Sequence, residues 1–134
     1  MGYLLEFDPV NRVLRVRFEG ELTEDILWEY YKDGKRHAPP DTRGAIFDLS
    51  AVTSIQVTSA AMQQLARMPP IIDDPLPRFI VASSDLVYGL ARMLQSYGGK
   101  TRQALHVVRR ITEAYSSLGI TAEHFRALEL LDQD

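Results

Sequence analysis

The apolar run Ala45-Ile46-Phe47-Asp48-Leu49 is the feature that most restricts how this chain can fold. It follows a glycine, and an apolar run of this length with one acid near its end is typical of a central strand covered on both faces. A second run of this type spans Phe79 to Ala82. Because such strands alternate with helical patterns, the sequence predicts an α/β domain with one sheet.

Two further strands are predicted at the start of the chain, at Tyr3 to Phe7 and Val13 to Phe18. The segment Asp8-Pro9-Val10-Asn11 between them is rich in turn formers, so we expect a β-hairpin that makes the sheet mixed. In the second strand apolar residues alternate with charged ones such as Arg15 and Arg17. This alternation predicts a strand with one solvated face.

Three helices are predicted between and after these strands, each with a Ser or Thr whose hydroxyl can cap its first turn. The first runs from Thr23 to about Arg36 and ends near Gly34 and Pro39-Pro40, and the second runs from Thr58 or Ser59 to Met68. The third opens at Ser83-Ser84-Asp85 and closes at Gly98-Gly99. Its apolar stripe consists of Leu86, Leu90, Met93, Leu94 and Tyr97.

The end of the chain carries a last predicted strand, Ala104 to Val108, and a helical tail. One tail helix starts at Thr112 and ends at Gly119, and a second starts at Thr121 and carries Phe125, Leu128 and Leu131. The predicted order is therefore ββαβαβαβα with a helical tail, in a single domain spanning residues 1–134.

Composition excludes several classes of protein. The 134 residues are 46% apolar and 25% charged with a net charge of -3, which is typical of a folded globular domain and gives no general attraction to nucleic acid. Cysteine is absent, which rules out disulfides and thiolate metal sites. No apolar run reaches the roughly 20 residues that a membrane span needs, so we expect a cytoplasmic protein without an integral membrane segment.

No motif for catalysis or for a bound metal or cofactor is evident. The three histidines, at positions 37, 106 and 124, lack the paired helical spacing of metal ligands. There is no Gly-x-Ser-x-Gly elbow and no glycine-rich phosphate loop between a strand and a helix. The adjacent acids Asp73 and Asp74 lie in a proline-rich loop that offers no burial to separate their pKa values. We therefore predict a protein that is not an enzyme and has no cofactor.

Four polar residues are candidates for a binding site. Asp48 lies near the carboxyl end of a buried strand, where ligands bind in open α/β sheets, or it accepts hydrogen bonds from the backbone of Ser50 to Thr53. Thr58 and Ser59 can cap a helix, and a phosphate on either hydroxyl would meet unpaired N–H groups there. With Gln56 they form a candidate phospho-acceptor or interaction turn.

At this segment the sequence resembles the STAS domain family, the anti-sigma-factor antagonists and their relatives, and in particular its SpoIIAA-like branch. Residues Ala45 to Thr53 resemble the family's third strand and turn, and Thr112 to Leu118 resemble its tail helix. Where kinase-switched members read Asp-Ser-Ser-Gly-Leu-Gly, this chain reads Gln56-Val57-Thr58-Ser59-Ala60-Ala61, which keeps only the hydroxyl, as Thr58. The resemblance implies a SpoIIAA-like fold and a regulatory role.

Two functional hypotheses follow. The first is a non-enzymatic regulatory module that docks an unidentified protein partner through the turn and helix 56–68. The second is a domain that binds a small apolar molecule or lipid, because the SpoIIAA-like branch also resembles a class of lipid-binding domains and the apolar loop Met68 to Ile72 could cover a cavity. The Ile71-Ile72 pair and the tail helix are also a candidate homodimer surface.

Overall fold

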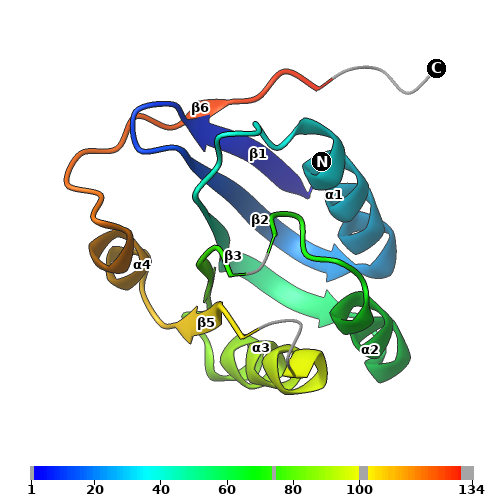
Figure 1. Ribbon diagram of the computed structural model, residues 1–134. Coiled ribbons are helices and arrows are strands. Elements are labelled where there is room, and N and C mark those ends of the chain that lie inside the picture. Colours follow the sequence, from blue (N-terminus) through cyan, green and yellow to red (C-terminus); the bar gives the residue numbers. More distant parts are fainter. Residues whose placement is uncertain (1, 74, 100–102, 131–134) are drawn as a thin grey trace.

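Ten helices and strands are assigned in the computed structural model, which describes residues 2–73, 75–99 and 103–130 (Figure 1). The strands are β1 (Tyr3–Asp8), β2 (Val13–Thr23), β3 (Gly44–Gln56), β4 (Arg78–Val81), β5 (Leu105–Val108) and β6 (Arg126–Ala127). The helices are α1 (Glu24–His37), α2 (Ser59–Arg67), α3 (Asp85–Gly98) and α4 (Ile111–Leu118). The strands form one sheet in the order β5-β4-β3-β2-β1-β6.

The predicted α/β class and the mixed sheet are confirmed. β1 and β2 form the expected antiparallel hairpin, and β2, β3, β4 and β5 run parallel to one another. Helices α1, α2 and α3 lie on one face of the sheet and α4 lies on the other (Figure 1). Because β3 is central, its residues Ala45 and Phe47 enter the larger core while Ile46 enters the core beneath α4. All three are buried, as predicted for a strand covered on both faces.

β3 is longer than predicted. The strand does not end at Leu49, and the turn expected at Ser50 to Thr53 is wrong, because β3 continues to Gln56 beside an equally extended β2. The pairing between these two strands has two register irregularities, which accommodate extra residues in β3. β4 in contrast ends at Val81, opposite Asp48, so residues 49–56 of β3 pair with β2 alone.

The tail differs in its second half. The helix expected at Thr112 is present as α4 and ends at Gly119 in the left-handed conformation, with φ 71°. The helix expected from Thr121 is wrong, because the chain there extends along β1 and forms β6. β1 offers unpaired backbone groups, and the amide of Leu128 donates to the carbonyl of Leu5 at 2.9 Å. Leu131 lies outside the described residues.

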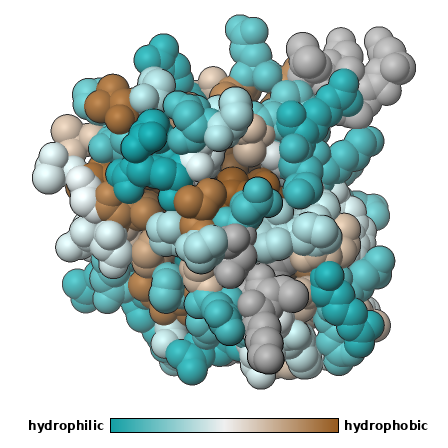
Figure 2. Space-filling model, viewed as in Figure 1, coloured by the Kyte–Doolittle hydropathy of each residue, from teal (hydrophilic) through white to brown (hydrophobic). Residues whose placement is uncertain are grey.

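The apolar stripe predicted for α3 is confirmed only in part, since Leu90 and Leu94 are half-buried while the other three residues are exposed. Leu86 is 63% exposed and Met93 and Tyr97 are also exposed, whereas Val87 and Ala91 are buried. This helix is apolar on more than one side, so residue spacing could not identify the side that faces the sheet. The face of the molecule in Figure 2 is mostly hydrophilic, with apolar residues in small separate patches.

Two predicted features near α1 are also corrected. Gly34 does not end the helix but lies buried within α1, where an added Cβ would come within 2.6 Å of the Ile71 side chain. Ile71 and Ile72 are buried, so the loop after α2 does not present the exposed apolar patch expected for a homodimer surface. Ile71 and Ile72 pack into the larger core. Within the described part of the chain, no helix has the length and apolar character needed to cross a membrane.

Candidate functional site

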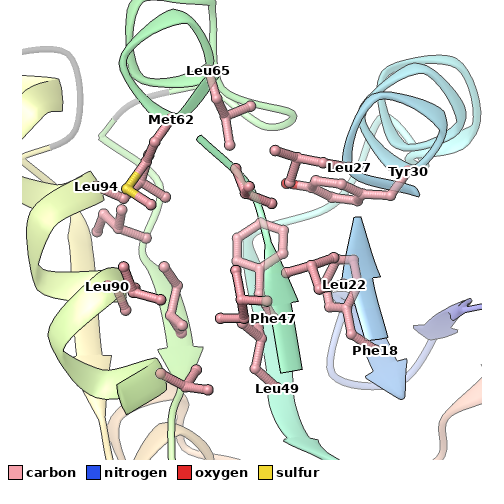
Figure 3. Close-up of a pocket in the computed structure, with 16 residues that line it drawn as sticks. Phe18, Leu22, Leu27, Tyr30, Phe47, Leu49, Met62, Leu65, Leu90 and Leu94 are labelled. Atoms are coloured by element: carbon pink, nitrogen blue, oxygen red, sulfur yellow. The ribbon is translucent and has the colours of Figure 1, made fainter. Parts of the chain in front are cut away.

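An apolar pocket of about 100 Å³ lies between the sheet and helices α1, α2 and α3 (Figure 3). Side chains from seven helices and strands surround it, among them Leu27 from α1, Leu65 from α2 and Leu90 from α3. The residues that line the pocket are Phe18, Leu22, Leu27, Tyr30, Phe47, Leu49, Ile55, Val57, Met62, Leu65, Ile80, Val87, Leu90, Ala91, Leu94 and Leu105.

The pocket lies where β4 ends and β3 continues. Leu49 and Ile55 of the extended part of β3 form one wall, and Val87 and Leu90 of α3 form the opposite side. Among the described residues, no strand pairs with the β3 extension on the side of β4, since the ladder with β4 stops at Asp48. The carboxyl ends of parallel strands are the usual place for ligands in open α/β sheets.

The chemistry of the pocket is that of a hydrocarbon surface. Its lining carries one side-chain polar group, the hydroxyl of Tyr30, and no carboxylate, amine or imidazole. Three aromatic rings of the lining are packed edge to face, with Tyr30 5.0 Å from Phe18 and 5.9 Å from Phe47 between ring centroids. Such a site can hold an apolar group, but its lining offers no acid or base for proton transfer near neutral pH.

Three of the four residues predicted as a site lie together at the end of β3. Thr58 caps α2, because its hydroxyl oxygen accepts a hydrogen bond from the amide of Ala61 at 3.1 Å, an interaction that stabilises a helix by about 1 kcal/mol. Gln56 and Ser59 flank this cap, and all three side chains are exposed. The capping role that the sequence predicted for Thr58 is therefore confirmed.

Asp48 does not join that turn. Its carboxylate accepts hydrogen bonds from the amide of Ser50 at 3.0 Å and from the Ser50 hydroxyl, which is the local acceptor role considered from the sequence. Eight residues of extended strand, or about 26 Å at 3.3 Å per residue, separate Asp48 from Gln56 along β3. Asp48 and the Gln56 turn therefore belong to different parts of the surface.

The backbone amide of Thr58 already has a carboxylate as its hydrogen-bond partner. The amide of Thr58 donates to Glu24 Oε2 at 2.9 Å, and Asp25 follows in the first turn of α1. A phosphate on Thr58 would add a charge of about -2 near these acids, which opposes the attraction of the helix dipole. Phosphorylation of Thr58 or Ser59 thus stays a prediction.

The pocket was not visible in the sequence. Its lining residues span positions 18 to 105 and look like ordinary core residues of their own strands and helices. Within the ranges that the structure describes, no group of three His, Cys, Asp or Glu side chains could hold a metal ion.

No protein-family model matches the chain, and no curated protein matches it. The α/β fold with its mixed sheet is observed directly, whereas the resemblance to STAS domains stays a prediction from the residues quoted above.

Proposed function

We propose that this chain is a non-enzymatic binding domain that takes up a small apolar molecule, or the apolar part of a larger one, in the pocket between α1, α2 and α3. The apolar lining of that pocket is the observation that carries the proposal. Small-molecule sites are concave and mostly apolar with few polar groups, and this pocket has that character with the Tyr30 hydroxyl as its polar group.

The size of the pocket limits its ligand. A volume of about 100 Å³ is below the roughly 300–1,000 Å³ of sites for drug-sized molecules, so only a small group enters without movement of the walls. α2 is the shortest of the three covering helices and contributes Met62 and Leu65 to the wall. A displacement of α2 would enlarge the site for a longer chain such as a lipid tail.

Benzene is a suitable probe because it fills small apolar cavities without needing a polar partner. We expect benzene to raise the melting temperature of the wild-type protein and to shift the amide NMR signals of pocket residues. Ala91→Leu adds three carbon atoms to the pocket lining and should abolish both effects. Ala60→Leu, which adds the same atoms at an exposed position of α2, is the matched control and should respond like the wild type.

Two outcomes would contradict the proposal. One is the absence of any benzene response in the wild-type protein, and the other is a response that Ala91→Leu leaves unchanged. If the benzene test succeeds, native mass spectrometry of protein purified from its own host is the measurement that identifies a natural apolar ligand retained through purification.

A second candidate function is the docking of a protein partner through the turn and helix 56–68. It is supported by the exposed side chains at the start of this segment, Gln56, Thr58 and Ser59, and by the hydrogen bonds of Thr58 with Ala61 and Glu24 that hold the turn in place. The outer face of α2 presents Gln64 and Arg67 to solvent.

Site-specific crosslinking tests this second candidate. A photoreactive phenylalanine at Gln64 is expected to capture a defined protein from extracts of the native host. The same group at Glu29, an exposed position of α1, is the control and should not. Docking through 56–68 would be rejected if neither position gave a crosslinked product, or if both positions gave the same product in equal amounts.

A further inference from the structure

The extended part of β3 is a long strand edge that, among the strands the structure describes, has a partner on one side only. Residues 49–56 pair with β2 up to Thr23↔Gln56, while the ladder with β4 stops at Asp48↔Val81. Gly44 to Phe47 are all buried, but none of the residues from Leu49 to Gln56 is. The amide of Ser50 donates a hydrogen bond to the Asp48 carboxylate. Among the described residues, no other backbone group of residues 49–56 has a hydrogen-bond partner outside the ladder with β2.

This edge lacks the side chains that usually protect such strands. Residues 49–56 read Leu-Ser-Ala-Val-Thr-Ser-Ile-Gln, with no charge, no proline and no glycine, and with three β-branched side chains. Exposed edges in natural proteins are usually short, charged or interrupted by proline, because an unpaired edge recruits other strands. The outermost strands of this sheet follow that rule, since β5 has four residues and β6 has two. Two register irregularities twist the β3 extension but leave it uncharged.

The apolar pocket lies directly beside this edge. Leu49 and Ile55 of the extension line it, on the face of the sheet that α1, α2 and α3 cover. A strand that pairs with residues 49–56 would direct every second side chain to that face. The pocket, at about 100 Å³, has room for one of those side chains if it is a branched aliphatic one such as Leu or Ile.

The charges on the β2 side of the edge indicate what the partner strand carries, while Arg109 on the other side, after β5, is already paired with Asp85. Segments 18–26 and 48–56 hold five acidic residues and no Lys or Arg, the acids being Glu19, Glu21, Glu24, Asp25 and Asp48. A strand added to β3 would lie about 10 Å from β2, at two strand spacings, which is close to the Debye length of about 10 Å at roughly 0.1 M salt. Basic side chains on the added strand would therefore be attracted.

A second copy of this chain suits the site less well. If two copies paired through this edge, the Leu49 and Ile55 side chains of each copy would already line that copy's own pocket. They would therefore not be available to fill the pocket of the other copy. We infer that an extended, basic segment of a partner protein adds as a strand along residues 49–56 and places one branched aliphatic side chain in the pocket. This inference rests on the apolar pocket of the proposed function.

A labelled synthetic peptide tests the inference on the intact protein. The probe alternates Lys with Thr, Val, Leu, Val and Thr, so that one leucine is central among the side chains on one face of the strand. We expect binding in fluorescence anisotropy that weakens at high salt, and amide NMR shifts confined to residues 49–56 and the pocket. A peptide with Asp in place of that leucine should bind at least about tenfold more weakly.

Two protein variants separate the edge from the pocket. Thr53 lies between Val52 and Ser54 and has no partner in the β2 register, so Thr53→Pro removes an edge N–H with little damage to that ladder. Thr53→Pro should weaken peptide binding at least about tenfold, whereas Thr53→Val should bind like the wild type. Ala91→Leu, which fills the pocket, should weaken it by a similar factor.

Several results would overturn the inference. They are the absence of peptide binding up to about 1 mM, NMR shifts on another surface, or full binding by Ala91→Leu. Light scattering that shows a wild-type dimer abolished by Thr53→Pro would assign the edge to a second copy. If benzene enters the pocket but the peptide does not bind, strand addition fails while the proposed function stands; if benzene also fails, both fall.

Discussion

Replacing Arg15 with leucine is expected to lower the free energy of unfolding by about 3–5 kcal/mol, because it removes the buried, hydrogen-bonded partner of a buried carboxylate. Arg15 and Glu6 are 6% and 7% exposed, and Arg15 Nε lies 2.9 Å from Glu6 Oε1. The guanidinium also donates to the hydroxyl of Tyr115 and stacks over the ring of Phe125, with 4.0 Å from its central carbon to the ring centroid. This is the face of β2 that the sequence predicted to be solvated.

Arg15 stays positively charged in the folded protein. Burial disfavours its charged form, but the hydrogen bonds and charges of Glu6 and Tyr115 outweigh that effect and raise the pKa of Arg15 above its ordinary value. The loss on substitution is therefore expected at neutral pH.

Urea unfolding followed by circular dichroism measures this effect. Arg17→Leu is the matched control, since the Arg17 side chain is 54% exposed and its nitrogen lies 3.8 Å from Glu6 Oε1. That variant should lose less than about 1 kcal/mol. The double variant Glu6→Leu/Arg15→Leu should recover most of the stability, because it buries no unpaired charge. A loss below about 1 kcal/mol in Arg15→Leu would mean that the tail can open and hydrate Glu6.

The second large effect is expected at Asp8, which fixes both the hairpin turn and the tail. Its carboxylate is fully buried and accepts hydrogen bonds from the amides of Val10, Asn11 and His124 and from the side chain of Asn11, at 2.7–3.0 Å. Asp8→Ala leaves these donors without an acceptor and should lower the free energy of unfolding by about 3 kcal/mol near neutral pH.

The loss should depend on pH. Burial by itself would raise the pKa of Asp8, but the hydrogen bonds from Asn11, His124 and Val10 outweigh it and hold the pKa below its ordinary value. A carboxyl group whose pKa is lowered by folding stabilises the folded state above its unfolded pKa of about 3.9, and that contribution is lost as the pH falls through the lower folded value.

Unfolding free energies measured from neutral pH downward test this dependence. The difference between wild type and Asp8→Ala should be constant down to about pH 5 and should then shrink with further acidification. Asp41→Ala, at an exposed acid, is the control and should follow the wild type throughout. A difference that does not change with pH would show that the charge of Asp8 is unimportant.

Local signals account for the parts of the fold that were predicted correctly. The turn formers after Asp8 specify the hairpin, the hydroxyls of Thr23, Thr58 and Ser84 cap α1, α2 and α3, and Gly119 ends α4. Each of these depends on residues within a few positions of one another, so the sequence alone contains the necessary information.

The predictions that failed depend on partners far away in the chain. β3 continues past Leu49 because an extended β2 lies beside it, and residues 126–127 form a strand because β1 has a free edge. The exposed side of α3 and the burial of Arg15 likewise depend on which elements pack against them. Such pairings are long-range, and local propensity cannot reveal them.

By itself, the sequence of this protein determined an α/β class, a mixed sheet that begins with a hairpin, and the Thr58 cap next to Gln56 and Ser59. Only the tertiary structure decided that Asp48 lies apart from that turn, that an apolar pocket opens where β4 ends, and that residues 49–56 form an unpaired edge. The reason is physical. A cap forms between neighbouring residues, whereas this pocket exists only where seven separate elements meet, and this strand edge only because one ladder stops short of another.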